Sequence, residues 1–242
     1  MLFRSNVKRV FLLGPSHTMY LSGCAISSQE YYATPLGNLK LDQSTIKELQ
    51  ATKKFDAWKA KSEEAEHSLE MHLPYIYKVL SNTLKSPDEF PLLIPVLVGA
   101  TSGPTERTYG EIFAPYLADP KSVFVVSSDF CHWGERFQYT YYLPASPSAN
   151  SDGYDLSRRD KAPTNPSIHE SIGRIDKLAM DAIEQGKHQG FLDNLKDTGN
   201  TVCGRHPIGV VMAALEILEQ EGKISAENGG RFKFVKIGRA HV

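Results

Sequence analysis

Three short apolar runs, each followed by glycine, proline or serine, predict buried β-strands. The runs cover Val7–Leu13, Leu92–Val98 and Ser122–Val126. None alternates cleanly with polar residues, so we expect both faces of each strand to be covered. This pattern favours an α/β fold in which a mainly parallel or mixed central sheet has helices on both faces.

Apolar residues at helical spacing predict helices between and after these strands. The patterns cover Asp42–Trp58, Glu63–Leu80, Ile168–Glu184 and Pro207–Glu221. In the first of them, Thr45 and Glu48 have the spacing of a capping box. Pro74 lies inside the second, so we expect a kink or a break there.

Three segments near loops and ends have their own predictions. Pro144–Ser167 is rich in proline and serine, and we expect a flexible surface insertion. Phe232–Val235 is typical of a strand entering the sheet. Ile237–Val242 is what a common sequencing-library adapter encodes when read in frame, so we expect read-through there and exclude His241 from any site. We expect one domain over residues 1–242, incomplete at both ends.

Composition narrows the class of protein. The 242 residues include 27 Lys plus Arg and 28 Asp plus Glu, for a formal net charge of −1, and 41% are hydrophobic. This balance argues against disorder and gives no electrostatic reason to expect a nucleic acid or an anionic membrane as partner. No apolar stretch approaches the ~20 residues of a membrane span, and the start does not resemble a signal peptide. Three cysteines, an odd and sparse set, favour a reducing compartment.

Four polar clusters, each at the end of an apolar run or the start of a helix, carry the candidate chemistry. They are Ser16–His17, Glu66–His72, Ser127–Trp133 and Cys203–Pro207. Ligands of parallel α/β sheets bind outside the carboxyl ends of the strands. A donor set of imidazole, thiolate and carboxylate suits iron, copper or zinc better than magnesium or calcium.

Other interpretations of the clusters stay open. His67 and His72 are five residues apart, a poor match to one helix face, and a structural role is equally consistent with their spacing. Cys131, between two larger side chains, is typical of a buried small hydrophobe. Cys203 with His206 would suit a cysteine hydrolase only in a geometry that sequence cannot supply. The chain has no Gly-x-Ser-x-Gly elbow and no glycine-rich phosphate loop.

Five motifs occur in an order that identifies a family resemblance. They are Gly14–His17, Glu66–Pro74, Ile94–Gly99, Ser127–Gly134 and Cys203–Gly209. Together they resemble the Memo family, the eukaryotic mediators of receptor-driven cell motility. The resemblance extends from about Val7 to about Glu221, with Pro144–Ser167 as an interruption. It implies a fold similar to the class III non-haem iron extradiol dioxygenases.

The resemblance also implies a metal site for iron or copper. It makes His17 and Cys203 metal ligands and His132 an acid–base group, with Asp129 beside it. A further histidine ligand belongs to a Pro-His-Ala-Gly motif that the family has upstream of the position of Met1, and this sequence does not contain it. A thiolate ligand favours copper or iron over harder ions. Additional pocket candidates are His67, Glu70, His72, Arg205 and His206.

The implied function is that of a cytoplasmic, or also nuclear, regulator of cell migration and cytoskeletal signalling with a redox-metal pocket. Its expected partners are signalling or cytoskeletal proteins or receptor-tail peptides, with no nucleic acid and no membrane insertion. Two alternatives stay open. One is a non-catalytic adaptor whose pocket binds phosphorylated or other peptides. The other is a metal-dependent oxidoreductase, an extradiol-type non-haem iron dioxygenase acting on a catechol-like substrate.

Overall fold

The structure is a computed structural model that describes residues 6–145, 153–225 and 230–235. The chain divides into two compact units. The first consists of Met1–Ser128 and Gly204–Ala214, and the second of Asp129–Cys203 and Leu215–Val242. The predicted read-through segment 237–242 and the middle of the predicted insertion, 146–152, lie outside the described residues.

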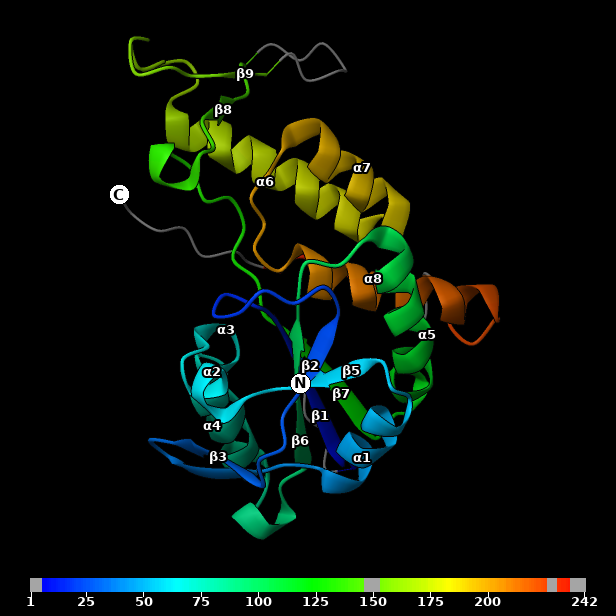
Figure 1. Ribbon diagram of the computed structural model, residues 1–242. Helices are drawn as coiled ribbons and strands as arrows, with labels where there is room; N and C mark the ends of the chain where they lie inside the picture. The colour runs from blue at the N-terminus through cyan, green and yellow to red at the C-terminus, as the bar shows by residue number, and fades with distance from the viewer. Residues whose placement is uncertain (1–5, 146–152, 226–229, 236–242) are drawn as a thin grey trace. The chain divides into compact units, whose positions relative to one another are not determined.

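A mixed five-stranded sheet forms the centre of the first unit (Figure 1). Its strands are β1 (Arg9–Pro15), β2 (Cys24–Ile26), β5 (Phe55–Ala57), β6 (Leu92–Val98) and β7 (Ser122–Val126). Their order is β5-β2-β6-β1-β7. Strand β1 is parallel to both β6 and β7, whereas β2 is antiparallel to β6. The three strands predicted from apolar runs are therefore confirmed.

Helices cover both faces of this sheet, as predicted. They are α1 (Gln43–Ala51), α2 (Ala60–Glu64), α3 (His67–Glu70), α4 (Leu73–Thr83), α5 (Gly103–Ala118) and the first part of α8 (Arg205–Gln220). Figure 1 shows α2, α3 and α4 on one side of the sheet and α1 and α5 on the other. On the α5 side, the Phe11 ring of β1 stacks on Phe124 at 4.6 Å and meets Phe113 edge-on at 5.9 Å. The antiparallel pair β3 (Tyr31–Thr34) and β4 (Gly37–Lys40) completes the unit, with a 3₁₀ turn at Pro87–Glu89.

The predicted helix over residues 42–58 is too long, and its predicted capping box is wrong. Helix α1 begins after Asp42, whose carboxylate accepts the Thr45 backbone N–H at 3.0 Å. Lys53 has a left-handed backbone conformation with φ of 57°, which ends the helical path soon after α1. Phe55 then enters strand β5 instead of continuing a helix.

The break predicted at Pro74 is confirmed. The apolar stripe is divided between α3 and α4, and Pro74 occupies the first turn of α4. A proline at that position lacks only an N–H group that would have no partner within the helix.

The second unit contains two packed helices and a short strand pair. They are α6 (Ile168–Glu184), α7 (His188–Thr198), β8 (Tyr141–Tyr142) and β9 (Tyr154–Asp155), with a 3₁₀ turn at Glu135–Phe137. Helices α6 and α7 lie side by side (Figure 1). The bounds of α6 match the prediction, and its N-terminus is closed by the Glu170 carboxylate, which accepts the Ser167 backbone N–H at 2.7 Å. In the predicted insertion, β9 pairs with β8, and most of the described residues are exposed.

The strand predicted at Phe232–Val235 is wrong. These residues form no strand, and Phe234 makes side-chain contacts instead. The Phe234 N–H donates to Glu184 Oε1 at 2.6 Å, and its ring meets Phe130 edge-on. Neighbouring Arg231 pairs with Glu219 at 3.0 Å.

None of the described helices combines the length and apolar composition that a membrane span requires.

Candidate functional site

The described residues contain two groups whose possible metal-ligand atoms lie within 4.8 Å of one another, one in each unit. His17, Glu66 and His67 form the group in the first unit. Asp129, His132 and Cys203 form the group in the second.

Glu66 organises the first group. Its buried carboxylate accepts backbone N–H groups from His17 at 2.7 Å, Thr18 at 3.2 Å and Ser68 at 3.1 Å. His17 Nδ1 lies 3.0 Å from Glu66 Oε1, and the His17 ring stacks on His67 at 4.6 Å. Burial alone would raise the pKa of Glu66, but the hydrogen bonds from His17 and Ser68 hold it below its usual value.

The local sequence explains why this group forms at the end of β1. Ser68 donates its hydroxyl to the Pro15 carbonyl at 2.8 Å and so ties α3 to the strand. A Cβ at Gly14 would lie 2.7 Å from Leu69 Cδ1 and 2.9 Å from Ser68 Oγ, so the close approach of α3 to β1 favours glycine there. The Gly-Pro-Ser-His and Glu-His-Ser-Leu motifs therefore form one local structure.

Reciprocal hydrogen bonds join Cys203 to Asp129 in the second group. The Asp129 backbone N–H donates to Cys203 Sγ at 3.1 Å, and the Cys203 N–H donates to the Asp129 carbonyl at 3.2 Å. These contacts bring together two segments 74 residues apart in the chain. The sulfur is therefore fixed beside a carboxylate whose side chain is 86% exposed.

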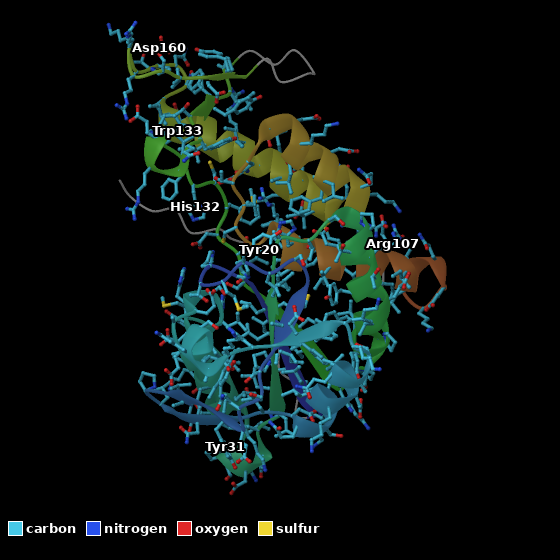
Figure 2. All side chains as sticks on the ribbon, in the orientation of Figure 1. Tyr20, Tyr31, Arg107, His132, Trp133 and Asp160 are labelled. Atoms are coloured by element: carbon cyan, nitrogen blue, oxygen red, sulfur yellow. The ribbon has the colours of Figure 1, made fainter. Side chains whose placement is uncertain are left out.

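Thr201 orients His132, which lies in the loop after β7 (Figure 2). The His132 N–H donates to Thr201 Oγ1 at 2.7 Å, and that hydroxyl donates back to the His132 carbonyl at 2.9 Å. His132 Nδ1 lies 3.1 Å from the Thr201 carbonyl. Because a carbonyl only accepts, Nδ1 carries the proton in this contact. Nε2 then faces Asp129, 4.0 Å from Oδ2.

Cys131 lies beside this group but does not belong to it. Its backbone N–H donates to Asp176 Oδ1 at 3.0 Å. Burial, with a smaller effect of the Asp176 charge, raises the pKa of the Cys131 thiol to about 12. A thiol with such a pKa is a poor nucleophile at neutral pH, although Cys131 is half-buried and not fully buried as predicted.

The remaining pocket candidates have separate surroundings in the first unit. His206 Nδ1 lies 2.8 Å from the buried Glu106 Oε1, which also accepts the Thr101 hydroxyl at 3.0 Å. Arg205 is exposed and directs its Nε toward His206 Nε2 at 3.4 Å.

On the other side of the same unit, Glu70 is an exposed residue at the end of α3. His72 is half-buried and immediately precedes α4. The roles of His67, Glu70, His72, Arg205 and His206 in a common pocket stay predictions, as does the role of His17 as a metal ligand.

The donor chemistry of the second group fits a transition metal better than that of the first. It offers a sulfur, an imidazole nitrogen and an exposed carboxylate, a mixed set of the kind that soft and borderline metals accept. A histidine whose other nitrogen is fixed by a backbone carbonyl is a common arrangement at metal sites. In the first group, by contrast, the Glu66 carboxylate is already occupied by three N–H donors.

Sequence reasoning missed three residues that organise these surroundings. They are Glu66, Thr201 and Glu106. Glu66 opens the predicted cluster Glu66–His72, and Thr201 lies two residues before Cys203, whereas Glu106 lies near none of the predicted clusters. No local pattern in the sequence marks the structural role of any of the three.

Several known proteins are similar to this chain over most of its length. Residues 1–233 match the family described as Memo-like protein. The protein MEMO1 of Homo sapiens is 45% identical over 218 residues, which are 90% of this chain and 66% of that protein. MEMO1 of Danio rerio is 44% identical over the same shares. The memo-1 homolog of Caenorhabditis elegans is 42% identical over 231 residues, 96% of this chain and 58% of that protein. The chain thus spans about two thirds of the length of the vertebrate relatives.

Proposed function

Because this chain belongs to the Memo family, we propose that it binds iron or copper and regulates cell migration or cytoskeletal signalling in the cytoplasm. The observation that supports metal binding is the Cys203 thiol, which is fixed by hydrogen bonds to the Asp129 backbone and lies beside the Asp129 carboxylate and the His132 imidazole. The signalling role, with signalling or cytoskeletal proteins or receptor-tail peptides as partners, rests on the family resemblance.

Each side chain of the group has a distinct role in the proposal. Cys203 supplies the thiolate, the donor that favours iron or copper over magnesium or calcium. His132 takes up and releases a proton at Nε2, because its Nδ1 proton is engaged by the Thr201 carbonyl. Asp129 supplies a negative charge close to that nitrogen. A bound iron or copper ion would add redox and Lewis-acid chemistry.

Metal content after anaerobic loading tests the proposal. The chain is incubated with Fe(II) or Cu(I), desalted, and analysed for metal per polypeptide by mass spectrometry. Cys203→Ala removes the proposed sulfur ligand and should weaken binding by at least about tenfold. Cys131→Ala is the matched control, since it removes a thiol from the same unit outside the group. Equal metal content in these two variants would reject the site.

Two further variants separate the roles of the histidines. His132→Gln should alter the pH dependence of any activity of the metal-loaded protein more than its metal content, as expected of an acid–base group. His17 is a ligand by family resemblance alone, and it lies in the first unit. His17→Ala with unchanged metal content would remove His17 from the ligand set without affecting the assignment of Cys203.

A further inference from the structure

The first unit contains a cavity of about 320 Å³ that the proposed metal chemistry does not use. Strand β3, the segment before α2, and helices α2 and α3 contribute to its walls. Three aromatic side chains line it, Tyr31, Tyr32 and Trp58. Tyr31 is half exposed and labelled in Figure 2, whereas Trp58 is only 3% exposed. The cavity therefore extends from an exposed aromatic ring to a buried one.

Four carboxylates make this cavity acidic. Glu63, Glu64, Glu66 and Glu70 line it, and no lysine, arginine or histidine is among its described lining residues. Glu66 already accepts three backbone N–H groups, so it contributes charge rather than a free acceptor. Glu64 and Glu70 are exposed. Aromatic rings beside carboxylates are the combination that attracts organic cations, through the ring faces as well as through charge.

Two buried polar atoms in the walls have no hydrogen-bond partner among the described residues. They are Glu63 Oε2 and Trp58 Nε1. Glu63 is nine-tenths buried, and its other oxygen accepts the Tyr32 hydroxyl. Burial raises the pKa of Glu63, and the hydrogen bonds from Ser27 and Tyr32 only partly offset this increase. Because leaving such groups unsatisfied is unfavourable, they indicate a ligand with a donor for the carboxylate and an acceptor for the indole.

We propose that this cavity binds an organic cation, an ammonium or guanidinium group with a neutral hydrogen-bond acceptor close to it. The cation donates to Glu63 Oε2 and lies among the aromatic rings, while the acceptor takes the Trp58 N–H. Glu70 adds attraction from the exposed side. A basic side chain in a peptide and a free amino alcohol share this chemistry.

Isothermal titration of the whole chain with four small probes tests the inference. Nα-acetyl-lysine methylamide carries the cation and amide acceptors, and ethanolamine is the free amino alcohol. Nα-acetyl-norleucine methylamide keeps the acceptors without the charge, and n-butylammonium keeps the charge without an acceptor. We expect saturable binding of at least one of the first two probes, with the stronger binder identifying the source. The norleucine compound should not bind, and butylammonium should bind more weakly than the stronger of the first two probes.

Variants locate the binding. Glu63→Gln should weaken binding of the stronger probe about tenfold or more, because it removes a buried charged acceptor. Glu70→Gln, an exposed change with little effect on folding, should weaken it roughly two- to fivefold. Trp58→Phe should weaken the stronger probe but leave butylammonium unchanged. Glu111→Gln is the control, since Glu111 is exposed on α5 and outside the cavity.

Several outcomes would overturn the proposal. Equal binding of the lysine and norleucine compounds would mean that charge is not recognised. Equal effects of Glu70→Gln and Glu111→Gln would move the binding away from this cavity. Saturable binding of Ca²⁺ that excludes the organic probes would make it an inorganic cation site. No binding by any probe would leave a cavity for water only.

Discussion

Glu66 shows how a single buried charge can organise the end of a strand. A carboxylate removed from water is unfavourable unless donors replace the lost hydration. Here backbone N–H groups from β1's following loop and from α3 supply those donors. The charge is therefore a structural element that joins two segments 49 residues apart.

We predict that Glu66→Gln lowers the free energy of unfolding at neutral pH by about 2–3 kcal/mol, because charge-assisted hydrogen bonds are lost. The pKa of Glu66 is depressed in the folded state. Its charge therefore stabilises the fold above the unfolded pKa of about 4.3, and this stabilisation disappears as the pH falls through the lower folded value. Urea unfolding at several pH values should show the difference between wild type and variant shrinking below about pH 4.

Glu64→Gln is the matched control, since Glu64 is exposed on the preceding helix. Its effect on unfolding should be within about 0.5 kcal/mol. A Glu66→Gln effect that stays constant into strongly acidic solution would contradict the charge-based explanation.

The candidate site was predictable in its residue types but not in its supporting contacts. His132, Asp129 and Cys203 stood out because nitrogen, oxygen and sulfur donors followed a strand or preceded a helix. Thr201 did not, because its importance comes from two hydrogen bonds to a residue 69 positions away. Tertiary donors of this kind leave no periodic or compositional trace in one sequence.

At the scale of elements, the contact between α5 and α8 depends on a glycine. A Cβ at Gly110 would lie 2.9 Å from both Ala213 Cβ and the Ala214 backbone nitrogen. Gly110→Ala should therefore destabilise the protein by about 1–3 kcal/mol through overpacking, although alanine is the better helix former by about 1 kcal/mol. Thermal unfolding measures the change.

Gly190 in α7, unlike Gly110, has space for a Cβ. A Cβ there would find its nearest neighbour, Lys187 Cβ, at an ordinary 3.7 Å. Gly190→Ala should stabilise the protein by about 0.5–1 kcal/mol, as helix propensity alone dictates. If both alanine variants changed stability in the same direction, close packing at Gly110 would not be the controlling effect.

Helices and strands were predictable where the local hydrophobic pattern was strong. The apolar run at Leu92–Val98 and the period of Ile168–Glu184 gave β6 and α6 with their observed bounds. Helix α5 was missed because Gly110 and Pro115 interrupt a weak pattern, whereas its start depends on the Ser102 cap. The strand expected at Phe232–Val235 failed because side-chain contacts compete with sheet pairing there.

At the scale of the whole molecule, a low net charge and an open sheet edge both favour association between molecules. The formal net charge of −1 gives little electrostatic repulsion between molecules. Strand β7 is the last strand of the five-stranded sheet in the described residues, with β1 as its neighbour. Such an edge presents unpaired backbone groups that can pair with another molecule.

We predict that this chain self-associates through β7 and that Val125→Lys reduces the association. Val125 is half-buried and follows Phe124, whose ring packs on the α5 side, so by strand alternation it faces away from that core. A lysine there places a charge at the edge while its aliphatic stem covers apolar surface. Light scattering against protein concentration measures the effect.

Gln220→Lys is the matched control, since it adds the same charge at an exposed position of α8, outside the sheet. Both changes take the formal net charge from −1 to 0, so net charge alone cannot reduce association. If both variants reduced scattering equally, the effect would not be specific to the β7 edge, and an unchanged Val125→Lys protein would exclude the edge altogether.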